Sequence, residues 1–369
     1  MALSYSEIKH IKEVAKKFKI ADGEITHVIQ VNSGRINASY KITVTQENDT
    51  VSYMLQKINT HVFPNVQDVM NNAILITNHL RSKGMETLEY IYTLTDEPLY
   101  YEDGVYRMTK FIHAEIFQNI TRPKDMYNLG FAVGQFTVGL SDFDANLLID
   151  PIPDFHNTSI RYQNLLISAI NNALTSKNGR VKEAENDIKF VNGNRAIYGC
   201  IVDSITRGDV PIRVTHNDTK LNNVLFDRKT NVPRCLIDLD TVMRGSTLYD
   251  IADAIRSGAN TSTEDDRRML NVKIDIELLR EFLQGFVMGA PNILTPQEIE
   301  LLPSAILILP FELGMRYLTD YFDGDIYFGI VNSDDNLMRA RVQFALANDI
   351  KNNMEDIKRI VYSIFGKNP

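Results

Sequence analysis

VTHNDTKLNNVLFDRKTNVPRCLIDLD, residues 214–240, is the stretch from which the fold and the chemistry of this chain are best read. His216, Asp218 and Asn223 form the pattern H-x-D-x-x-x-x-N, and Asp238 follows in the apolar run C-L-I-D. A pattern this short also arises by chance, so its weight depends on the secondary structure expected around it.

Three short β-runs frame these residues. One spans Pro211 to Thr215, the next spans Val224 to Phe226, and the third carries Asp238. Apolar and β-branched residues bounded by Asn, Asp and Pro are typical of strands. The sequence therefore predicts a polar loop between two strands, with a carboxylate on a third, which is the layout that a catalytic loop requires.

The residue types in this loop suit phosphoryl transfer. In a kinase, the loop Asp accepts the proton of the acceptor hydroxyl, the Asn holds Mg²⁺, and a strand-end Asp bridges Mg²⁺ to the phosphates. Mg²⁺ prefers hard oxygen ligands and keeps several waters, which suits one amide carbonyl and one carboxylate. We therefore predict that Asp218 is the catalytic base and that Asn223 and Asp238 are Mg²⁺ ligands.

Two more loop residues are catalytic candidates. Lys220 lies where protein kinases place a lysine, so it is expected to offset negative charge on the moving phosphoryl group. His216 is also included, although a histidine at such a position more often braces the loop by hydrogen bonding. Asp250 is expected near the start of a helix, where the helix dipole favours a carboxylate, so its role is structural first.

Several segments resemble the aminoglycoside phosphotransferase and choline kinase superfamily. The general match is carried by HNDTKLNNVLFD (216–227), CLIDLDTV (235–242) and YDIADAIR (249–256). A narrower match, to the bacterial N-acetylhexosamine 1-kinases, is carried by YMLQKIN (53–59), IPDFHNT (152–158) with Arg161, ELGMRYLTDY (312–321) and GDIYF (324–328). The similarity runs from about residue 30 to 330, nearly the whole chain.

This resemblance implies an α+β, bilobal, protein-kinase-like fold, with a small antiparallel-sheet N-terminal lobe and a larger, mainly helical C-terminal lobe. The expected domains are a nucleotide-binding lobe, residues 1–112, and a catalytic and acceptor-binding lobe, residues 113–369. The implied activity is ATP- and Mg²⁺-dependent phosphorylation of the anomeric hydroxyl of an N-acetylhexosamine.

The hydrophobic pattern of the N-terminal third agrees with a small sheet-rich lobe. Apolar residues at helical spacing from Ile8 to Phe18 predict an amphipathic first helix. Three strands are expected at residues 25–31, 38–45 and 51–58, and a helix at 66–82. From Pro123 onward the long apolar periodicities are helical.

Nucleotide is expected between the lobes. Gly34 and Asn37 lie between two predicted strands, where a glycine loop covers phosphates, although a single glycine also fits an ordinary hairpin. Gln56 and Lys57 point to opposite faces of the third strand. We predict that Lys57 binds the phosphates, with a solvent-facing lysine as the alternative and Asp68 as its candidate acid partner.

Adenine is expected to bind beside the segment that joins the two lobes. Met108 and Phe111 are predicted to hydrogen-bond it through backbone groups, although the same segment also fits a plain linker.

Acceptor recognition is expected at the segment that precedes a new helix. A sugar requires several directional polar groups and an apolar or aromatic face. That mixture is supplied by Asp154, Phe155, His156, Asn157 and Arg161. The alternative is a capped helix entry, in which Asn157 or Thr158 bonds the free N–H groups of the first turn.

Arg316 and Tyr327 are further substrate-binding candidates, which the resemblance to the hexosamine kinases supports. Arg316 lies on an apolar helix, where a guanidinium must find partners. The alternative is a structural ion pair with Glu312 or Asp320, each four positions away.

Composition limits the partners. A net charge of −8 without a basic patch argues against nucleic acid or an anionic membrane as the main partner. The two cysteines predict no disulfide framework, and no apolar run approaches eighteen residues, since even Leu301 to Leu309 is interrupted by Pro303 and Ser304. The cytoplasm is the expected location. Oligomeric state is left open.

Two alternatives to the hexosamine kinase remain at this stage. One is a kinase of the same fold that acts on choline, homoserine, methylthioribose or an aminoglycoside. The other is a non-catalytic nucleotide-binding pseudokinase. The choice between GlcNAc and GalNAc is also open, because one epimeric hydroxyl can be discriminated by a single side chain.

Overall fold

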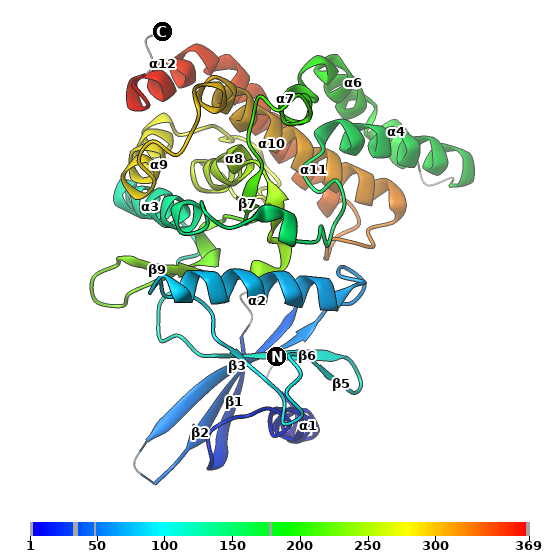
Figure 1. Cartoon of the computed structure of the whole chain (residues 1–369). Helices are drawn as coiled ribbons and strands as arrows, with labels where there is room; N and C mark the ends of the chain where they lie inside the picture. The colour runs from blue at the N-terminus through cyan, green and yellow to red at the C-terminus, as the bar shows by residue number, and fades with distance from the viewer. Residues whose placement is uncertain (1–2, 32–35, 48, 177–178, 367–369) are drawn as a thin grey trace. The chain divides into compact units, whose positions relative to one another are not determined.

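The computed structural model describes residues 3–31, 36–47, 49–176 and 179–366. The chain divides into two compact units (Figure 1). The smaller unit comprises Met1–Glu115, Asn146–Ile152 and Leu225–Met243, and the larger unit comprises Ile116–Ala145, Pro153–Val224 and Arg244–Pro369. The predicted α+β class is confirmed, because an antiparallel sheet dominates the smaller unit and helices dominate the larger one.

The sheet of the smaller unit is antiparallel, with the order β1-β2-β3-β6-β4, and β5 also pairs with β6. Its strands are β1 (Glu24–Val31), β2 (Ala38–Thr45), β3 (Thr50–Ile58), β4 (Tyr90–Ile91), β5 (Tyr100–Tyr101) and β6 (Val105–Lys110). The three strands predicted first along the chain are thus confirmed to within a residue. Each alternates more buried and less buried positions over part of its length, as a sheet covered on one face requires.

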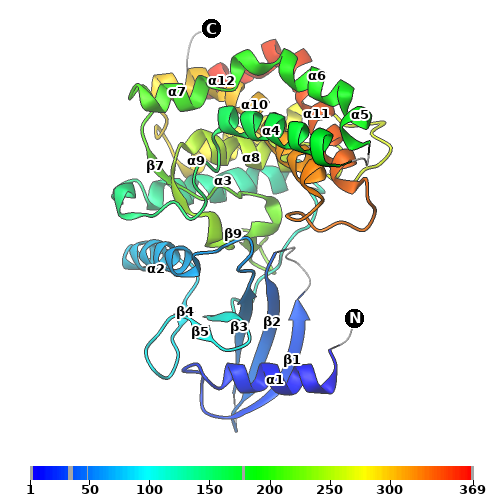
Figure 2. The same ribbon diagram turned by 90° about the vertical axis from the view of Figure 1, so that its right-hand side faces the viewer.

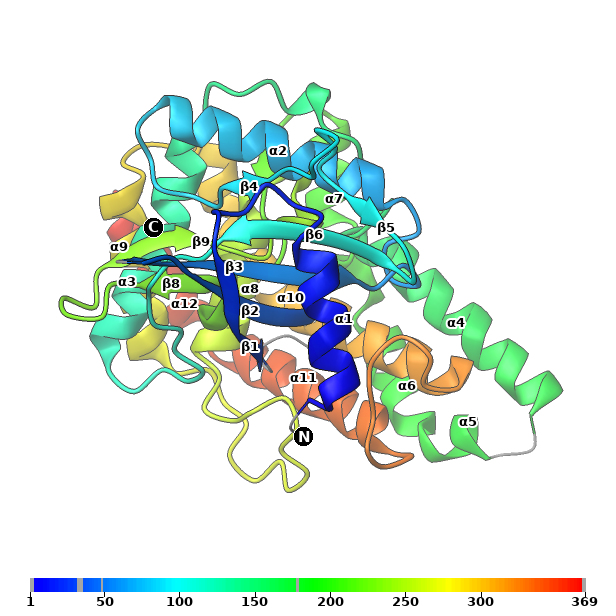
Figure 3. The same ribbon diagram turned by 90° about the horizontal axis from the view of Figure 1, so that it is seen from below.

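Helix α1 (Tyr5–Ala15) covers one face of this sheet, and Figure 3 shows it lying across the strands. A capping box formed by Ser4 and Glu7 starts the helix, since each residue bonds a backbone N–H at the other's position. Its apolar stripe packs with residues of β2, β3 and β6 in one buried core. The core includes Ile11, Val14, Ala15, Phe18, Ile42, Val44, Tyr53, Leu55, Tyr106 and Met108.

Helix α2 (Val66–Ser82) follows β3 and precedes β4 in the chain, at the residues where a helix was predicted. Asn72 of this helix is buried, and its side-chain amide makes hydrogen bonds to backbone groups. Its Nδ2 donates to the carbonyls of Ile149 (2.7 Å) and Val242 (2.9 Å), and its Oδ1 accepts from the Ile149 N–H. One buried amide therefore holds two segments that are distant in sequence against α2.

The larger unit is a set of packed helices (Figure 2). Its helices are α3 (Pro123–Gly139), α4 (Thr158–Thr175), α5 (Arg180–Glu183), α6 (Glu185–Gly193), α7 (Cys200–Thr206), α8 (Thr247–Gly258), α9 (Ile276–Gly289), α10 (Pro296–Asp323), α11 (Asp335–Asn352) and α12 (Met354–Ile364). Helices α3 and α9 approach closely because of glycine. A Cβ on Gly130 or Gly285 would lie 2.0 Å from a backbone oxygen of the facing helix.

Helix α10 continues through two prolines, the first of which interrupts the apolar run noted in the sequence. Pro303 and Pro310 lie inside its 28 residues. An interior proline removes a helical hydrogen bond, and here both prolines are buried in the core of the unit. By length and composition α10 passes as a membrane span, but 78% of its apolar window is buried inside the structure, as in a core helix.

The short strands around the quoted stretch are β7 (Arg213–Thr215), β8 (Val224–Phe226), β9 (Pro233–Leu236) and β10 (Met243–Gly245). Strand β8 pairs with β9, and β10 pairs with β7. The third predicted strand is too long by two residues. It ends at Leu236, and Asp238 lies just beyond it with φ 64° and ψ 57°, in the left-handed region that strands do not use.

Candidate active site

The loop after β7 brings the predicted catalytic side chains together. Nδ2 of Asn223 donates to the Asp218 carboxylate over 2.9 Å and to the Asp218 carbonyl over 2.8 Å. Nζ of Lys220 lies 3.0 Å from the other carboxylate oxygen. Asp218 is thus held from two sides, and its side chain keeps 26% of its surface exposed.

The carboxylate of Asp250 binds the backbone of this loop. Its carboxylate accepts hydrogen bonds from the backbone N–H groups of His216 (2.9 Å) and Asn217 (2.7 Å), and Oγ1 of Thr219 donates to its carbonyl (2.6 Å). Asn217 adopts φ 65°, a strained backbone conformation that these bonds stabilise. The structural role expected for Asp250 is confirmed, but its carboxylate serves a loop 33 and 34 residues earlier in the chain and not its own helix.

A buried ionic network extends this support. Asp253 accepts from the Thr219 N–H (3.1 Å) and from Arg256, which also binds Glu264 over 2.8 Å. Burial opposes ionisation of Glu264, but the charge of Arg256 outweighs it and lowers the pKa of Glu264 to about 2. Tyr317 of α10 donates to the same carboxylate. The contacts that tie this network to the loop and to α10 were not predicted, because Thr219–Asp253 and Tyr317–Glu264 are 34 and 53 residues apart in the chain.

The electrostatics of Asp218 favour a carboxylate. Burial acts to raise its pKa, but the charges of Lys220 and His216 and the hydrogen bonds from Lys220 and Asn223 outweigh burial. The pKa of Asp218 therefore lies below its ordinary value, and the group is ionised at neutral pH. His216 is fully buried, with its ring edge-on to Phe136 at 5.6 Å, which agrees with a bracing role.

The two predicted metal ligands present suitable atoms. Asn223 uses Nδ2 to hold Asp218, so its carbonyl oxygen, for which no described residue is a hydrogen-bond donor, is left for a cation. Asp238 is exposed at the end of β9, in the smaller unit. Within the described residues no three His, Cys, Asp or Glu side chains cluster as a dense metal site. One amide and one carboxylate suit Mg²⁺, which keeps most of its water.

Two residues after Asp238, Asp240 takes part in a buried ion pair of the smaller unit that was not predicted from the sequence. Arg107 of β6 binds the carboxylate of Asp240, and each side chain is only 3% exposed. The second oxygen of Asp240 accepts from Nδ2 of Asn37 over 2.7 Å, and Nε of Arg107 donates to Gln56 over 2.9 Å. Asn37 is thereby bonded to the turn at Leu239–Thr241 that follows β9, while Gly34 lies outside the described residues.

Lys57 does not point toward this group. Its Nζ lies 2.9 Å from Asp103 and 5.4 Å from the centre of the Tyr106 ring, on the face of the sheet that α1 covers. Asp68, its candidate partner, accepts instead from Asn65 at the start of α2. The acid partner of Lys57 is therefore Asp103, from the turn before β6.

Met108 lies in the interior of the sheet. It is fully buried in β6, between Leu55 of β3 and Ile91 of β4, so its backbone is flanked by two strands. The structure therefore does not favour adenine binding by the backbone of Met108.

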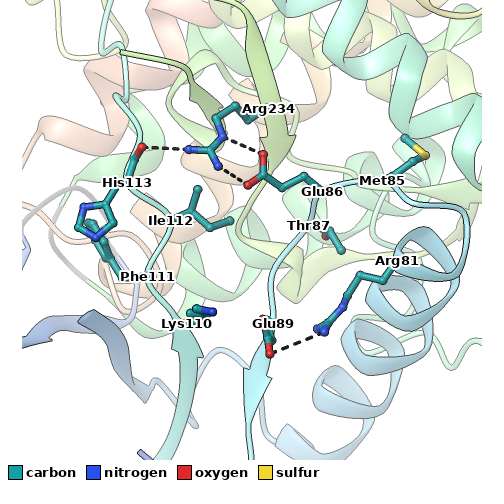
Figure 4. Close-up of a pocket in the computed structure, with 10 residues that line it drawn as sticks. All are labelled: Arg81, Met85, Glu86, Thr87, Glu89, Lys110, Phe111, Ile112, His113 and Arg234. Atoms are coloured by element: carbon teal, nitrogen blue, oxygen red, sulfur yellow. Dashed lines mark hydrogen bonds and ion pairs between the residues drawn. The ribbon is translucent and has the colours of Figure 1, made fainter. Parts of the chain in front are cut away.

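The linker after β6 carries free backbone groups. Among the described residues none bonds the carbonyl of Phe111 or the N–H groups of Ile112 and His113, whereas the His113 carbonyl accepts from Arg234 over 3.0 Å. A cavity of about 440 Å³ lies beside this linker (Figure 4). Arg234, which lines this cavity, binds Glu86 as well as the His113 carbonyl, so the linker is joined to the segment between α2 and β4.

The segment before α4 shows the capped helix entry. Asn157 is the N-cap residue and accepts from the Ile160 N–H over 3.2 Å, and Asp154 (φ 55°) accepts from Asn157. His156 is also committed to the fold. Its Nδ1 lies 2.7 Å from Glu312, and its ring stacks on Tyr249 at 4.7 Å.

Arg316, in contrast, pairs with neither candidate acid. Glu312 is occupied by His156 and Thr158, and Asp320 accepts from the N–H groups of the loop at residues 326–328. The Arg316 guanidinium lies among aromatic rings. Their centres are 4.7 Å (Phe155), 5.8 Å (Tyr327) and 5.6 Å (Phe328) from its central carbon.

Arg161 joins this group. It donates from Nε and Nη2 to the carbonyl of Phe155, and burial together with the nearby charge of Arg316 lowers the pKa of its guanidinium. We call Phe155, Arg161, Arg316, Tyr327 and Phe328 the acceptor cluster. It unites four of the residues that the sequence assigned to the substrate. Asp154 and Asn157 bond within the helix entry, and Nδ1 of His156 bonds Glu312, whereas the buried Nε2 of His156 has no hydrogen-bond partner among the described residues.

Solved structures share this architecture at low sequence identity. A protein from Alicyclobacillus acidocaldarius described as an aminoglycoside phosphotransferase matches with a TM-score of 0.60 at 15% identity, covering 95% of this chain and 96% of that one. A choline kinase from Cryptosporidium parvum matches with 0.56 at 15% identity, over 95% and 96%. A spectinomycin phosphotransferase solved with ADP and spectinomycin matches with 0.54 at 15% identity, over 94% and 98%.

The sheet-bearing smaller unit, the helical larger unit and these matches define a protein-kinase-like fold, as predicted. Residues 27–284 match the model of the phosphotransferase enzyme family, which is most of the chain. The protein belongs to this family of phosphotransferases.

Proposed function

We propose that this protein is an ATP- and Mg²⁺-dependent kinase that phosphorylates the anomeric hydroxyl of an N-acetylhexosamine to give the sugar 1-phosphate. The observation that carries the proposal is the loop from His216 to Asn223. It presents an ionised, partly exposed Asp218 between Lys220 and Asn223 and is fixed by the buried carboxylate of Asp250.

Asp218 is proposed to orient the acceptor hydroxyl and take its proton. An anomeric hydroxyl is more acidic than an ordinary alcohol, because the ring oxygen withdraws electrons, so a carboxylate of low pKa suffices as its base. Lys220, whose Nζ lies 3.0 Å from the Asp218 carboxylate, is proposed to offset negative charge on the phosphoryl group as it passes to the sugar hydroxyl. His216 supports the loop from its buried position.

Nucleotide binding is proposed for the smaller unit. The Phe111 carbonyl and the N–H groups of Ile112 and His113, which no described residue bonds, supply the acceptor and donor that an adenine edge requires. The spectinomycin phosphotransferase was solved with ADP and also with AMP, which supports an adenine nucleotide here. Asn223 and Asp238 would hold Mg²⁺, which supplies charge neutralisation at the phosphates when bound.

The acceptor cluster favours a neutral, polar acceptor over a cation. Two arginines lie there with aromatic rings, and the nearby Glu312 is already bound by His156 and Thr158. A choline, ethanolamine or aminoglycoside cation would meet positive charge. A 2-acetamido sugar offers hydroxyl and carbonyl oxygens to the guanidinium groups and an apolar ring face to Tyr327.

The test is incubation with ATP, Mg²⁺ and single acceptors, followed by phosphorus NMR. We expect an anomeric sugar phosphate with GlcNAc, GalNAc or both, and none with choline, homoserine, methylthioribose or kanamycin. Phosphate transfer to one of these four compounds and not to a hexosamine would overturn the proposed sugar substrate and identify the acceptor class instead. Absence of any ATP turnover by the wild type, with ATP still bound, would favour the pseudokinase.

A cytoplasmic location is part of this proposal. Both cysteines are free thiols, with Cys235 buried and Cys200 partly so, as expected in a reducing compartment. The nucleotide and the sugar substrate are also expected there. The lobe boundary near residue 112 remains a proposal for where the nucleotide-binding part ends.

A further inference from the structure

The two faces of the small sheet differ in chemistry. In the register of β2, β3 and β6, Leu55 lies between Tyr40 and Met108, whereas its neighbour Gln56 lies between Ser39 and Arg107. Cross-strand neighbours share a face, and successive residues alternate. The Leu55 face is the apolar one under α1, so Gln56 and Arg107 belong to the opposite, polar face.

Lys57 is on the wrong face to join this polar group. It follows Gln56 on β3, and its side chain is bound to Asp103 and lies over Tyr106, a member of the core under α1. A side chain with this direction cannot serve the other face of the same strand. A positively charged side chain on the polar face must therefore come from a strand other than β3 or from another position in it.

Arg107 is that cation. Its Nε donates to Gln56 and its Nη1 to Asp240, while no described residue accepts from its Nη2. A guanidinium has five donors in a rigid plane, so two contacts can fix it and leave one edge for a ligand. The charge is nearly buried, which strengthens any hydrogen bond that this edge makes to an anion.

Three segments expected to handle phosphate meet at Arg107. Asn37, from the segment between β1 and β2, bonds Asp240 over 2.7 Å and accepts from the Asn59 N–H over 2.9 Å. Gln56 comes from β3. Asp238 precedes Asp240 by two residues, and its charge acts on the guanidinium. The arginine therefore lies where the segment between β1 and β2, the central strand β3 and the turn after β9 converge.

We propose that Arg107, and not Lys57, is the cation that the smaller unit presents to the phosphates of the nucleotide. Asp240 and Gln56 fix the plane of its guanidinium, and Nη2 donates to a phosphate oxygen. This inference rests on the proposed function for the presence of a nucleotide.

A purely structural ion pair is the competing explanation. Removing one partner of a buried pair leaves an uncompensated charge and destabilises the fold, so a single variant alone does not separate the two explanations. Replacing both charges together removes this penalty. The double variant Arg107→Met with Asp240→Asn retains an amide that can still bond Asn37.

Calorimetric titration of the full chain with ATP, ADP and adenosine, each with Mg²⁺, tests the proposal. We expect Arg107→Met and the double variant to lose about tenfold to a hundredfold in affinity for ATP and ADP, as for a hydrogen bond to a charged group. Adenosine affinity should be unchanged. Lys57→Met is the matched control, and we expect less than about fivefold loss, as for a half-exposed ion pair.

The outcomes are distinguishable. Equal losses for adenosine and ATP in the folded double variant would overturn the inference, because they would show a structural role alone. Loss of ATP affinity in Lys57→Met with none in the double variant would overturn it as well. Failure of the wild type to bind any adenine nucleotide would overturn the proposed function, and the inference with it. Thermal unfolding of each variant confirms that binding is measured on folded protein.

Discussion

The catalytic loop and the acceptor cluster both belong to the larger unit, but they are held in different ways. The loop from His216 to Asn223 is fixed by buried carboxylates that bind its backbone. The acceptor cluster holds Arg316 by aromatic faces, and Tyr327 is 39% exposed. A rigid backbone suits proton and phosphoryl transfer, whereas side chains that stack without ionic partners leave donors for a substrate.

The largest effect is expected at the rigid region. Asp218→Asn keeps the shape of the side chain but cannot accept a proton, so we expect kcat to fall by about 10²- to 10⁴-fold, as for loss of a general base. Acceptor KM should change little. Steady-state kinetics with each hexosamine provide the measurement, and Asp209→Asn, at an exposed partner of Arg207, is the control. Unchanged kcat would remove Asp218 from the chemistry.

The acceptor cluster should respond in the opposite way. Arg316→Met keeps much of the stacked volume but removes the donors, so we expect acceptor KM to rise about tenfold to a hundredfold, as for hydrogen bonds to a charged group. ATP affinity should stay the same. Arg267, which pairs with Asp334 and Asp335 at the surface, is the matched control as Arg267→Met. A fall in kcat with constant KM would contradict the comparison.

The difference between the two regions also explains what the sequence could predict. The spacing of Asp218 and Asn223 is local, and so are the strands around them and the helix cap at Asn157. Local spacing and turn chemistry are readable from one sequence. These expectations therefore agree with the structure.

Features that depend on long-range pairing were not predicted. Asp240 has no local sign that it binds Arg107, 133 residues earlier. The face on which Lys57 lies depends on strand register, which a one-residue shift reverses. Asp238 was placed in a strand because apolar residues precede it, but the strand ends at Leu236 and Asp238 itself adopts a left-handed conformation.

The brace under the catalytic loop provides the third test. Asp250→Asn retains one carbonyl oxygen where two backbone N–H groups are now bound, so one N–H loses its acceptor. We expect a loss of about 2 kcal/mol in the free energy of unfolding, as for an unsatisfied buried group. Urea unfolding measures it. A matching fall in kcat at constant acceptor KM would show that the brace serves the loop and not the acceptor cluster.

The smallest effect is expected where the two regions are connected. Glu264 accepts from Arg256, which supports the loop through Asp253, and from Tyr317, the neighbour of Arg316 on α10. The pKa of Glu264 is lowered to about 2, so its charged form stabilises the fold above its ordinary value of 4.5, and this contribution is lost as pH falls toward 2. Glu264→Gln should therefore cost on the order of 1–2 kcal/mol at pH 7 and progressively less below pH 4.

Urea unfolding of Glu264→Gln and wild type from pH 7 to pH 3 measures this difference. Glu185→Gln, at an exposed pair with Lys189, is the control and should show little change at any pH. A stability difference that does not shrink in acid would mean that Glu264 acts by packing and not by charge. If kcat and acceptor KM both change in Glu264→Gln while Asp250→Asn changes kcat alone, the carboxylate couples the two regions, because it is bound by groups from each.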